Sequence, residues 1–327
     1  MERVIRPIPP RENLLVTGGN DKSIKVWDTS DSKKDIPLPK PDFEDQQGSC
    51  VRTLVGHTDC VRAARFHPDG VHMVSAGSDM TLRVWHIKNA YTVQVLDGKS
   101  AGRSAGHTGW IYDLQISPDG NQVLSAGSYD TSIKLWDLKA GHCIRTFYNK
   151  PDSWAYCLSV FGVTGEKALV GYSNKEMVLW DTNIGSKRIF KGHSKAVHQV
   201  AVSNDQTCGL SASADSTVRV WDLHAGECIT TMLGHTGPVE SVALSKNGKI
   251  AVSGGRDKEL KLWDMDSGEN IMTFRGHRGS VGSVAMTDDF SVFSGSHDKT
   301  AKSWDIRSAS CINTFTGHSG WIRDVSL

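Results

Sequence analysis

The sequence predicts an all-β fold built from seven copies of one repeated unit. Trp followed by Asp recurs along the chain, and a Gly-His pair precedes most copies. The Trp-Asp pairs begin at Trp27, Trp136, Trp180, Trp221, Trp263 and Trp304, and Trp85-His86 is a seventh copy. The Gly-His pairs end at His57, His107, His193, His235, His277 and His318. From Trp136 onwards the successive Trp residues are 44, 41, 42 and 41 residues apart, and a period in the low forties is typical of propeller or solenoid units.

Each copy has the pattern of four short strands. In the copy from Gly234 to Thr273, apolar residues alternate with small or polar ones over 239–244, and further runs follow at 249–253, 259–263 and 270–273. The segments between them are rich in Gly, Asn and Asp. Short alternating runs joined by such turns predict one antiparallel sheet per unit, and no helical periodicity is found in the sequence.

The unit from Gly-His to Trp-Asp resembles the WD-repeat family, and the resemblance covers nearly the whole chain, 1–327. It implies a single seven-bladed β-propeller with four-stranded antiparallel blades around a central channel. The first blade has inner strands at 14–17 and 23–27 and a later strand near 51–55, so the C-terminal segment 321–327 fits its innermost place. We expect the C-terminal strand to close the ring there, because an open ring would leave unpaired backbone groups at both ends. The alternative is that the sequence, which stops abruptly at Leu327, is truncated.

Two insertions lengthen the repeat, at 29–49 and at 97–105. We expect both to be flexible loops, although long loops on a rigid scaffold can also carry binding or regulation. The second contains Gly98-Lys99-Ser100-Ala101-Gly102, which matches the G-x-S-x-G of a nucleophile elbow. No helical pattern follows it, as that motif requires, so a loop is the favoured interpretation.

The family resemblance also implies a buried network of His, Ser or Thr, Asp and Trp in many blades. Such a network is rigid when complete and costly when one member is missing. The matching sets are His57, Ser75, Asp79 and Trp85; His193, Ser211, Asp215 and Trp221; His235, Ser253, Asp257 and Trp263; His277, Ser294, Asp298 and Trp304; and, from opposite chain ends, His318, Thr17, Asp21 and Trp27. A Ser-His-Asp hydrolase triad would occur once and in a cleft, so the repetition favours a structural role and no catalytic residue is expected.

Two blades depart from this pattern. In blade 3, Ser125 is one residue out of register with Asp130. Blade 4 has no Gly-His pair, and Val170 and Asn174 stand where the hydroxyl and the Asp are expected. We expect blade 4 to be the least rigid blade or to be stabilised differently.

In the WD-repeat family the face around the channel mouth is the usual docking surface. We take the two positions that flank the start of each innermost strand and the residue before each turn Asp. The residue types at these positions are unevenly distributed among the blades. Residue types that dominate binding hot spots gather in blades 1 to 4, as Arg62, Trp110, Tyr112, Tyr129, Trp154, Tyr156, Trp321 and Arg323. We expect these residues to form one partner-binding arc; the alternative is that the rings turn inward and fill the channel wall.

The composition of the chain narrows the remaining classes of function and location. The net charge is +1, so no global field attracts nucleic acid or anionic lipid. The seven cysteines are odd in number and have no CxxC spacing, which argues against a disulfide framework and a zinc site. No signal peptide and no long apolar run is found. These features indicate an intracellular protein, in the cytoplasm or the nucleus, without cofactor, metal, membrane partner or small-molecule substrate.

We therefore expect a non-catalytic scaffold or adaptor that binds other proteins or peptide motifs. Two alternatives stay open. One is a substrate receptor of a ubiquitin-ligase complex, which normally needs an extra module such as an F-box. The other is a subunit of a ribonucleoprotein or ribosome-assembly complex, because aromatic rings beside arginines can stack on RNA bases; the near-neutral charge disfavours nucleic acid.

Overall fold

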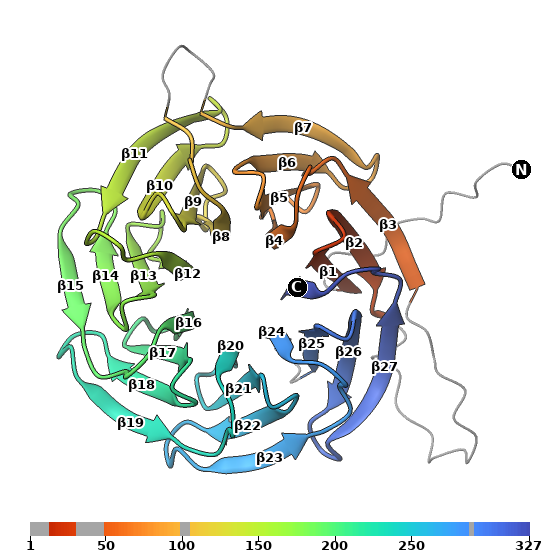
Figure 1. The fold of residues 1–327 in the computed structure, drawn as a ribbon, viewed down its shortest axis with the longest axis vertical. Helices are drawn as coiled ribbons and strands as arrows, with labels where there is room; N and C mark the ends of the chain where they lie inside the picture. Colours follow the sequence, from red (N-terminus) through yellow and green to blue (C-terminus); the bar gives the residue numbers. More distant parts are fainter. Residues whose placement is uncertain (1–12, 31–48, 99–104, 288–290) are drawn as a thin grey trace, which may run out of the picture.

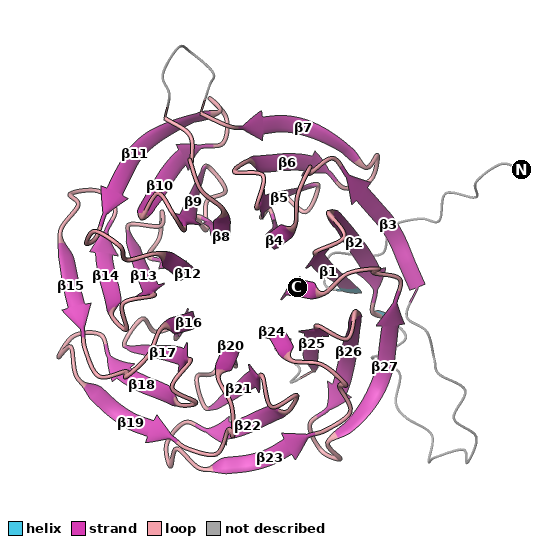
Figure 2. Cartoon of the chain, in the orientation of Figure 1, coloured by secondary structure: helices cyan, strands magenta, loops and turns pink. Residues whose placement is uncertain are grey.

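Seven four-stranded antiparallel sheets stand side by side in a ring in the computed structural model (Figure 1). The structure describes residues 13–30, 49–98, 105–287 and 291–327. Within these residues the strands are joined by loops and turns, and no α-helix is present (Figure 2). The predicted seven-bladed β-propeller is therefore confirmed.

We number the blades 1 to 7 and letter their strands A to D from the axis outwards. Blade 1 contains β28 (Ile322–Ser326), β1 (Leu14–Gly19), β2 (Ser23–Asp28) and β3 (Ser49–Val55); blade 2 contains β4 (Val61–Phe66), β5 (His72–Gly77), β6 (Leu82–His86) and β7 (Tyr91–Leu96); blade 3 contains β8 (Ile111–Ile116), β9 (Gln122–Gly127), β10 (Ser132–Asp137) and β11 (His142–Tyr148); and blade 4 contains β12 (Ala155–Phe161), β13 (Lys167–Tyr172), β14 (Met177–Asp181) and β15 (Lys187–Phe190). Blade 5 contains β16 (Val197–Val202), β17 (Cys208–Ser213), β18 (Val218–Asp222) and β19 (Cys228–Met232); blade 6 contains β20 (Val239–Leu244), β21 (Ile250–Gly255), β22 (Leu260–Asp264) and β23 (Asn270–Phe274); and blade 7 contains β24 (Val281–Met286), β25 (Val292–Ser296), β26 (Thr300–Asp305) and β27 (Ser310–Thr316).

The hydrophobic core lies between neighbouring blades rather than within any one of them. Val16 of blade 1 packs in one cluster with Val61 and Trp85 of blade 2, and equivalent clusters join the other blades. The B strands are therefore buried along their length, as in β1, whereas the outermost strands, such as β7, alternate in exposure. Because a sheet must cover its apolar faces with other sheets, each blade depends on both neighbours.

The ring closes between the two ends of the described chain. β28 pairs antiparallel with β1, with Val16 opposite Ser326 and Thr17 opposite Val325. Figure 1 shows the blue C-terminal strand inside the red β1 at the axis. The expected closure is confirmed, and the inner edge of β1 that would otherwise carry unpaired backbone groups is satisfied.

Side chains near the axis also link successive A strands. Asp113 of β8 accepts the backbone N–H of Leu158 in β12 at 3.0 Å. The same type of bond joins three other pairs of neighbouring blades, from Ala64 N–H to Asp324, from Val284 N–H to Ser241 and from Val325 N–H to Ser283. Polar side chains in an otherwise apolar strand therefore cap the N–H groups that have no ladder partner.

The strands fix which loops share a face. Because neighbouring strands in a blade run in opposite directions, the B–C turns and the D–A connections open on one face, which we call the B–C face. The A–B and C–D turns open on the other, the A–B face. Most of the two predicted insertions, 31–48 and 99–104, lies outside the described residues, as does most of the G-x-S-x-G match at 98–102.

Removing the closing strand should destabilise the whole ring. A chain shortened to end at Gly317 loses β28, the partner of β1, and so removes Ile322 and Val325 from the apolar cluster between blades 7 and 1. We expect the cooperative thermal transition to shift down by more than about 10 °C or to disappear, since each kcal/mol moves the midpoint of a domain this large by a few degrees. Circular dichroism melting measures this, and a chain lacking only Leu327 is the control. A Gly317-terminated chain that melts with the full chain would contradict strand closure as the stabilising contact.

Candidate functional site

The buried networks of His, Ser or Thr, Asp and Trp, which we call quartets, fix the turns on the B–C face. In blade 6 the indole N–H of Trp263 donates to Ser253 Oγ at 2.8 Å, and Ser253 lies 2.7 Å from His235 Nε2. His235 Nδ1 lies 2.7 Å from Asp257 Oδ2. The indole can only donate, so the hydroxyl gives its proton to Nε2 and Nδ1–H donates to the carboxylate. Every polar atom in the chain of contacts thus has a partner.

The structure brings together all the sets that match this pattern in the sequence. The corresponding contacts join His57, Ser75, Asp79 and Trp85; His193, Ser211, Asp215 and Trp221; and His277, Ser294, Asp298 and Trp304. His318 contacts Thr17 at 2.7 Å and Asp21 at 2.8 Å, and Trp27 donates to Thr17. The quartet of blade 1 therefore ties the last strand of the chain to the first.

Blade 3 completes a quartet in spite of its shifted register. Ser125 contacts His107 Nε2 at 2.7 Å and accepts the indole N–H of Trp136 at 2.9 Å. The reason is that the extra residue lies in the B–C turn and not in the strand. Ser128 N–H bonds to the carbonyl of Trp110, as Ser78 N–H does to that of Cys60 in blade 2. The extra residue is therefore Tyr129, whose ring the turn leaves 58% exposed on the B–C face.

Blade 4 replaces the quartet with a tyrosine. Tyr172 is fully buried, and its hydroxyl accepts the indole N–H of Trp180 at 3.1 Å. Tyr172 pairs with Ala155 as Gly77 pairs with Val61 in blade 2. A Cβ atom at Gly77 would lie only 2.8 Å from His57 Nδ1. Serine does occupy this position beside the histidine in blades 5 and 7, as Ser213 and Ser296. Blade 4 has no histidine there, so the much larger ring of Tyr172 can be buried, and this blade is stabilised differently.

The quartets keep the carboxylates charged. Burial alone would raise the pKa of Asp79, but the hydrogen bond from His57 and the backbone N–H of Thr58 outweigh it and bring the pKa to about 2. The pKa of Asp215 is also about 2, because bonds from Thr217, Ser194 and His193 outweigh its burial. The serine hydroxyls are buried and already bonded on both sides. The geometry therefore gives these Ser-His-Asp sets a structural role and leaves no nucleophile open to a substrate.

An aromatic cluster lies on the B–C face over blades 3 and 4. The Trp110 and Tyr129 ring centroids are 5.4 Å apart, those of Tyr129 and Trp154 are 5.0 Å apart, and those of Tyr112 and Tyr156 are also 5.0 Å apart. All five rings are partly exposed. The edge-to-face and tilted geometry that such rings prefer joins them into one surface, which we call the aromatic arc.

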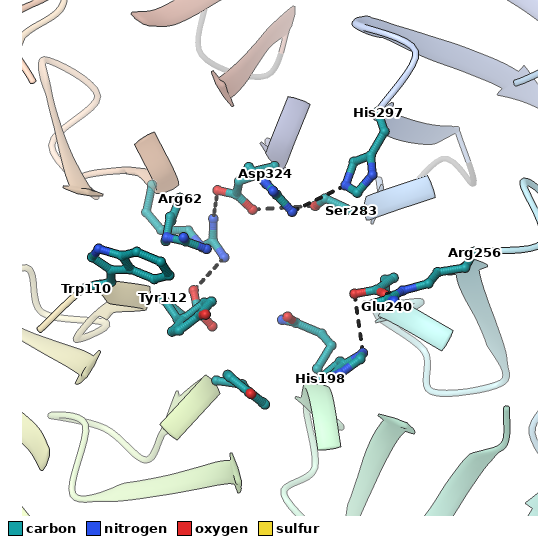
Figure 3. Close-up of a pocket in the computed structure, with 15 residues that line it drawn as sticks. Arg62, Trp110, Tyr112, His198, Glu240, Arg256, Ser283, His297 and Asp324 are labelled. Carbon is teal, nitrogen blue, oxygen red and sulfur yellow. Dashed lines mark hydrogen bonds and ion pairs between the residues drawn. The ribbon is translucent and has the colours of Figure 1, made fainter. Parts of the chain in front are cut away.

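The arginines of the predicted arc stack on its rings. The Arg62 guanidinium lies 4.7 Å from the Trp110 centroid and 4.3 Å from that of Tyr112. Figure 3 shows the three side chains together at the cavity. Arg323 lies 5.0 Å from the ring of Trp321, and Trp321 stacks on His297 at 4.4 Å. The structure thus forms two groups from the predicted residues, one on blades 2 to 4 and one on blades 1 and 7.

A cavity of about 450 Å³ lies at the axis between these groups. Trp110 and Tyr112 line one side of it (Figure 3), and Tyr156 is also part of its lining. On the opposite side, Glu240 forms an ion pair with Arg256, and His198 Nδ1 lies 3.3 Å from Glu240 Oε2. Burial would raise the pKa of Glu240, but His198 and Arg256 lower it to about 2. The rings therefore do form part of the channel wall, while Trp110 remains 36% exposed at its mouth.

The floor of the cavity was not anticipated from the sequence. Arg65 forms ion pairs with both Asp113 and Asp324 and so bridges blades 1 to 3. Burial raises the pKa of Asp113 to about 6, although Arg65 opposes the rise. In each of these three A strands a charged residue stands where the alternating pattern would place an apolar one. This was the sequence signal that could have identified the bridge. The predicted closure places the three strands in neighbouring blades, but it does not show which of their side chains meet.

Other chemistry has little support in the described residues. They contain no group of His, Cys, Asp and Glu side chains that could hold a metal ion. Burial raises the pKa of the Cys60 thiol, and the neighbouring Asp59 raises it further. The nearby Arg62 and Arg323 act in the opposite direction. In the part of the chain that the structure describes, no helix could cross a membrane.

Comparison with known proteins places these features in a family. The family model for the "WD domain, G-beta repeat" matches residues 5–28, 48–86, 98–137, 185–222, 226–264 and 268–305. These six segments leave out 138–184, which contains most of blade 4. The chain is 30% identical over 249 residues to "Nuclear distribution protein PAC1" of Arthroderma otae, covering 67% of this chain and 49% of that protein. It is 29% identical over 219 residues to "Autophagy-related protein 16" of Arabidopsis thaliana, covering 67% and 38%. The chain thus spans half or less of the length of these relatives.

Removing one quartet hydroxyl should be more costly than removing an exposed hydroxyl nearby. In Ser211→Ala, Trp221 N–H and His193 Nε2 lose their shared partner inside the protein. We expect the free energy of unfolding to fall by about 2 kcal/mol, the penalty for unsatisfied buried groups. Urea denaturation measures this. The control is Ser194→Ala, because Ser194 is exposed and contributes only its backbone N–H to Asp215; equal effects of the two changes would refute the network's role.

The protein should also lose stability as the pH falls. Burial lowers the pKa of His107, His193 and His277, with the paired carboxylates opposing it. The unfolded chain therefore binds more protons below about pH 6.5. The lowered pKa values of Asp79 and Asp215 extend the loss from about pH 4 downwards. The raised pKa of Asp113 acts in the opposite direction but belongs to a single group. Unfolding midpoints in urea measured from neutral to acid pH should decrease steadily; a flat profile between about pH 6.5 and pH 4 would contradict this assignment.

Proposed function

Because the chain belongs to the WD-repeat family, we propose that it is a non-catalytic platform that assembles protein complexes by binding a partner on the aromatic arc. The observation that carries the proposal is the continuous, partly exposed surface of Trp110, Tyr112, Tyr129, Trp154 and Tyr156. Trp, Tyr and Arg dominate the binding energy of protein interfaces, and large exposed aromatic patches usually mark interaction sites.

The asymmetry of the ring supports one docking surface. Blades 1, 3 and 4 carry Trp321, Trp110 and Trp154 at the position whose backbone carbonyl holds the B–C turn. The equivalent residues in the other blades are Cys60, Ala196, Pro238 and Ser280. The backbone bond is the same in every blade, so the fold does not require tryptophan there. A function of the side chain on the B–C face explains the difference.

The rigidity of the scaffold favours binding over catalysis. The rings are presented from the ends of A strands and from B–C turns that the quartets and inter-blade bonds fix. A preformed surface loses less conformational entropy on association. The names of the relatives refer to nuclear distribution and to autophagy, and the proposal takes from them only the general role of a complex-forming repeat domain.

RNA binding is a second candidate, because one specific contact favours it. Arg62 stacks between the rings of Trp110 and Tyr112, and arginine beside aromatic rings is a common platform for unpaired bases. The net charge of +1 gives no extended field for a phosphate backbone. The protein-binding role is therefore the better supported of the two.

The double variant Trp110→Ala with Tyr156→Ala should abolish partner capture and leave the fold intact. Both side chains lie at the cavity mouth and take no part in a quartet. Affinity purification with mass spectrometry should show the proteins retained by the wild type and lost by the double variant. The matched control is Val163→Ala with Ile184→Ala, two exposed residues in A–B and C–D turns of blade 4. If the aromatic variant retains the same proteins as the wild type, the arc is not the docking surface. Crosslinking to RNA that is lost with the same variant would favour the second candidate.

A further inference from the structure

The arginines that line the cavity differ in whether they have a counter-ion. Arg65 pairs with Asp113 and Asp324, and Arg256 pairs with Glu240. Arg62 and Arg323 have no carboxylate partner among the described residues. Arg62 Nε donates to Ser78 Oγ at 2.7 Å, and Arg323 Nε donates to Asn20 Oδ1 at 2.9 Å. Two guanidinium groups at the mouth therefore lack a compensating negative charge.

Both guanidinium groups are held in position by neutral neighbours. Each is fixed at Nε by a hydrogen bond and stacks on a ring, Arg62 on Trp110 and Tyr112, and Arg323 on Trp321. Arg62 makes no further hydrogen bond within the described residues, so its two terminal nitrogens are available. Arg323 uses one terminal nitrogen to contact His297 at 3.3 Å. The donors are thus oriented before any ligand arrives, which reduces the cost of binding.

The two charges are close enough to affect each other. Burial lowers the pKa of Arg323, and the nearby Arg62 lowers it further. Burial and then Arg323 likewise lower the pKa of His297. A bound anion would relieve this repulsion in a partly desolvated place, where opposite charges attract more strongly than in water.

We infer that Arg62 and Arg323 receive the side-chain carboxylates of an acidic segment in a protein partner, whose neighbouring apolar or aromatic residue packs on the aromatic arc. This inference rests on the proposed function and names the chemistry of its partner. A guanidinium presents a fork of N–H groups that matches one carboxylate. Because Ser78 and Asn20 fix the two groups separately, two carboxylates fit better than a single phosphate gathered between them.

The rest of the cavity limits the length of the acidic segment. Glu240 stands on the opposite wall (Figure 3), and Asp113 and Asp324 also line the cavity. The uncompensated positive charge is therefore confined to blades 1 and 2. A short motif of Asp or Glu matches this extent, whereas a nucleic-acid backbone would need a longer basic track.

The test is a selection of random peptides displayed on phage, carried out with the purified full chain. The baits are the wild type, Arg62→Gln, Arg323→Gln and the matched control Arg275→Gln, whose arginine pairs with Glu259 and does not line the cavity. We expect the wild type and Arg275→Gln to enrich peptides with Asp or Glu beside an aromatic or aliphatic residue. Arg62→Gln and Arg323→Gln should lose this enrichment. Thermal melting of the four baits checks that each is folded.

The best selected peptide then gives the size of the effect. Fluorescence anisotropy should show that changing its Glu or Asp residues to Gln or Asn weakens binding about tenfold, equivalent to about 1.4 kcal/mol. Arg62→Gln should weaken the unchanged peptide by a similar factor, and binding should weaken as salt is added.

Several results would overturn the inference. These are a selected pool without acidic residues, equal losses in Arg275→Gln and Arg62→Gln, a phosphoserine peptide that binds at least about tenfold more tightly than the carboxylate peptide, or displacement of the peptide by oligouridine. The proposed function fails separately. If Arg62→Gln captures the wild-type set of proteins while the Trp110 and Tyr156 double variant does not, the docking surface stands and its acidic specificity is wrong.

Discussion

The antiparallel pairing of β28 with β1 is the contact on which the rest of the structure depends. Each blade buries its apolar faces against two neighbours, so none is complete until the circle is closed. The same pairing brings His318 to Thr17 and Asp21, and it places Asp324 within reach of Ala64 and Arg65 in blade 2. One strand therefore completes a sheet, a polar quartet and the link between blades 1 and 2.

The polar quartets and the apolar clusters stabilise the ring in different ways. The apolar clusters favour burial but are non-directional, so they do not fix the B–C turns at the face. The quartets do so, because Asp79 accepts from His57 and from the backbone N–H of Thr58 at once. Blade 4 shows that the indole needs an acceptor but not this particular one, since Tyr172 serves Trp180 in place of a serine.

The blades share one backbone arrangement, so the proposed function depends on which side chains stand at equivalent positions in different blades. The backbone bond from the B–C turn to the residue before strand A is present in all seven blades, yet only three of these residues are tryptophan. The extra residue in the blade 3 turn adds Tyr129 between Trp110 and Trp154. Among the described residues that line the cavity, Arg62 and Arg323 have no carboxylate partner, whereas Arg65 and Arg256 are paired with acidic side chains, so a symmetric fold presents an asymmetric surface.

The sequence by itself determined the repeat, the strands and the closure, because the Trp-Asp period and the turn residues are local signals. The strand boundaries expected for 234–273 differ by at most two residues from those of β20 to β23. It also identified the members of most quartets, since their spacing is constant. Ser125 was misjudged as out of register because whether an added residue lies in a strand or in its turn is decided by pairing across the sheet. Tyr172 as an acceptor depends on how two adjacent strands of one blade place their side chains. The Arg65 bridge between Asp113 and Asp324 and the unequal charge compensation of the arginines depend on side chains from different blades. These contacts are set by side-chain positions in the folded ring, so tertiary structure alone decided them.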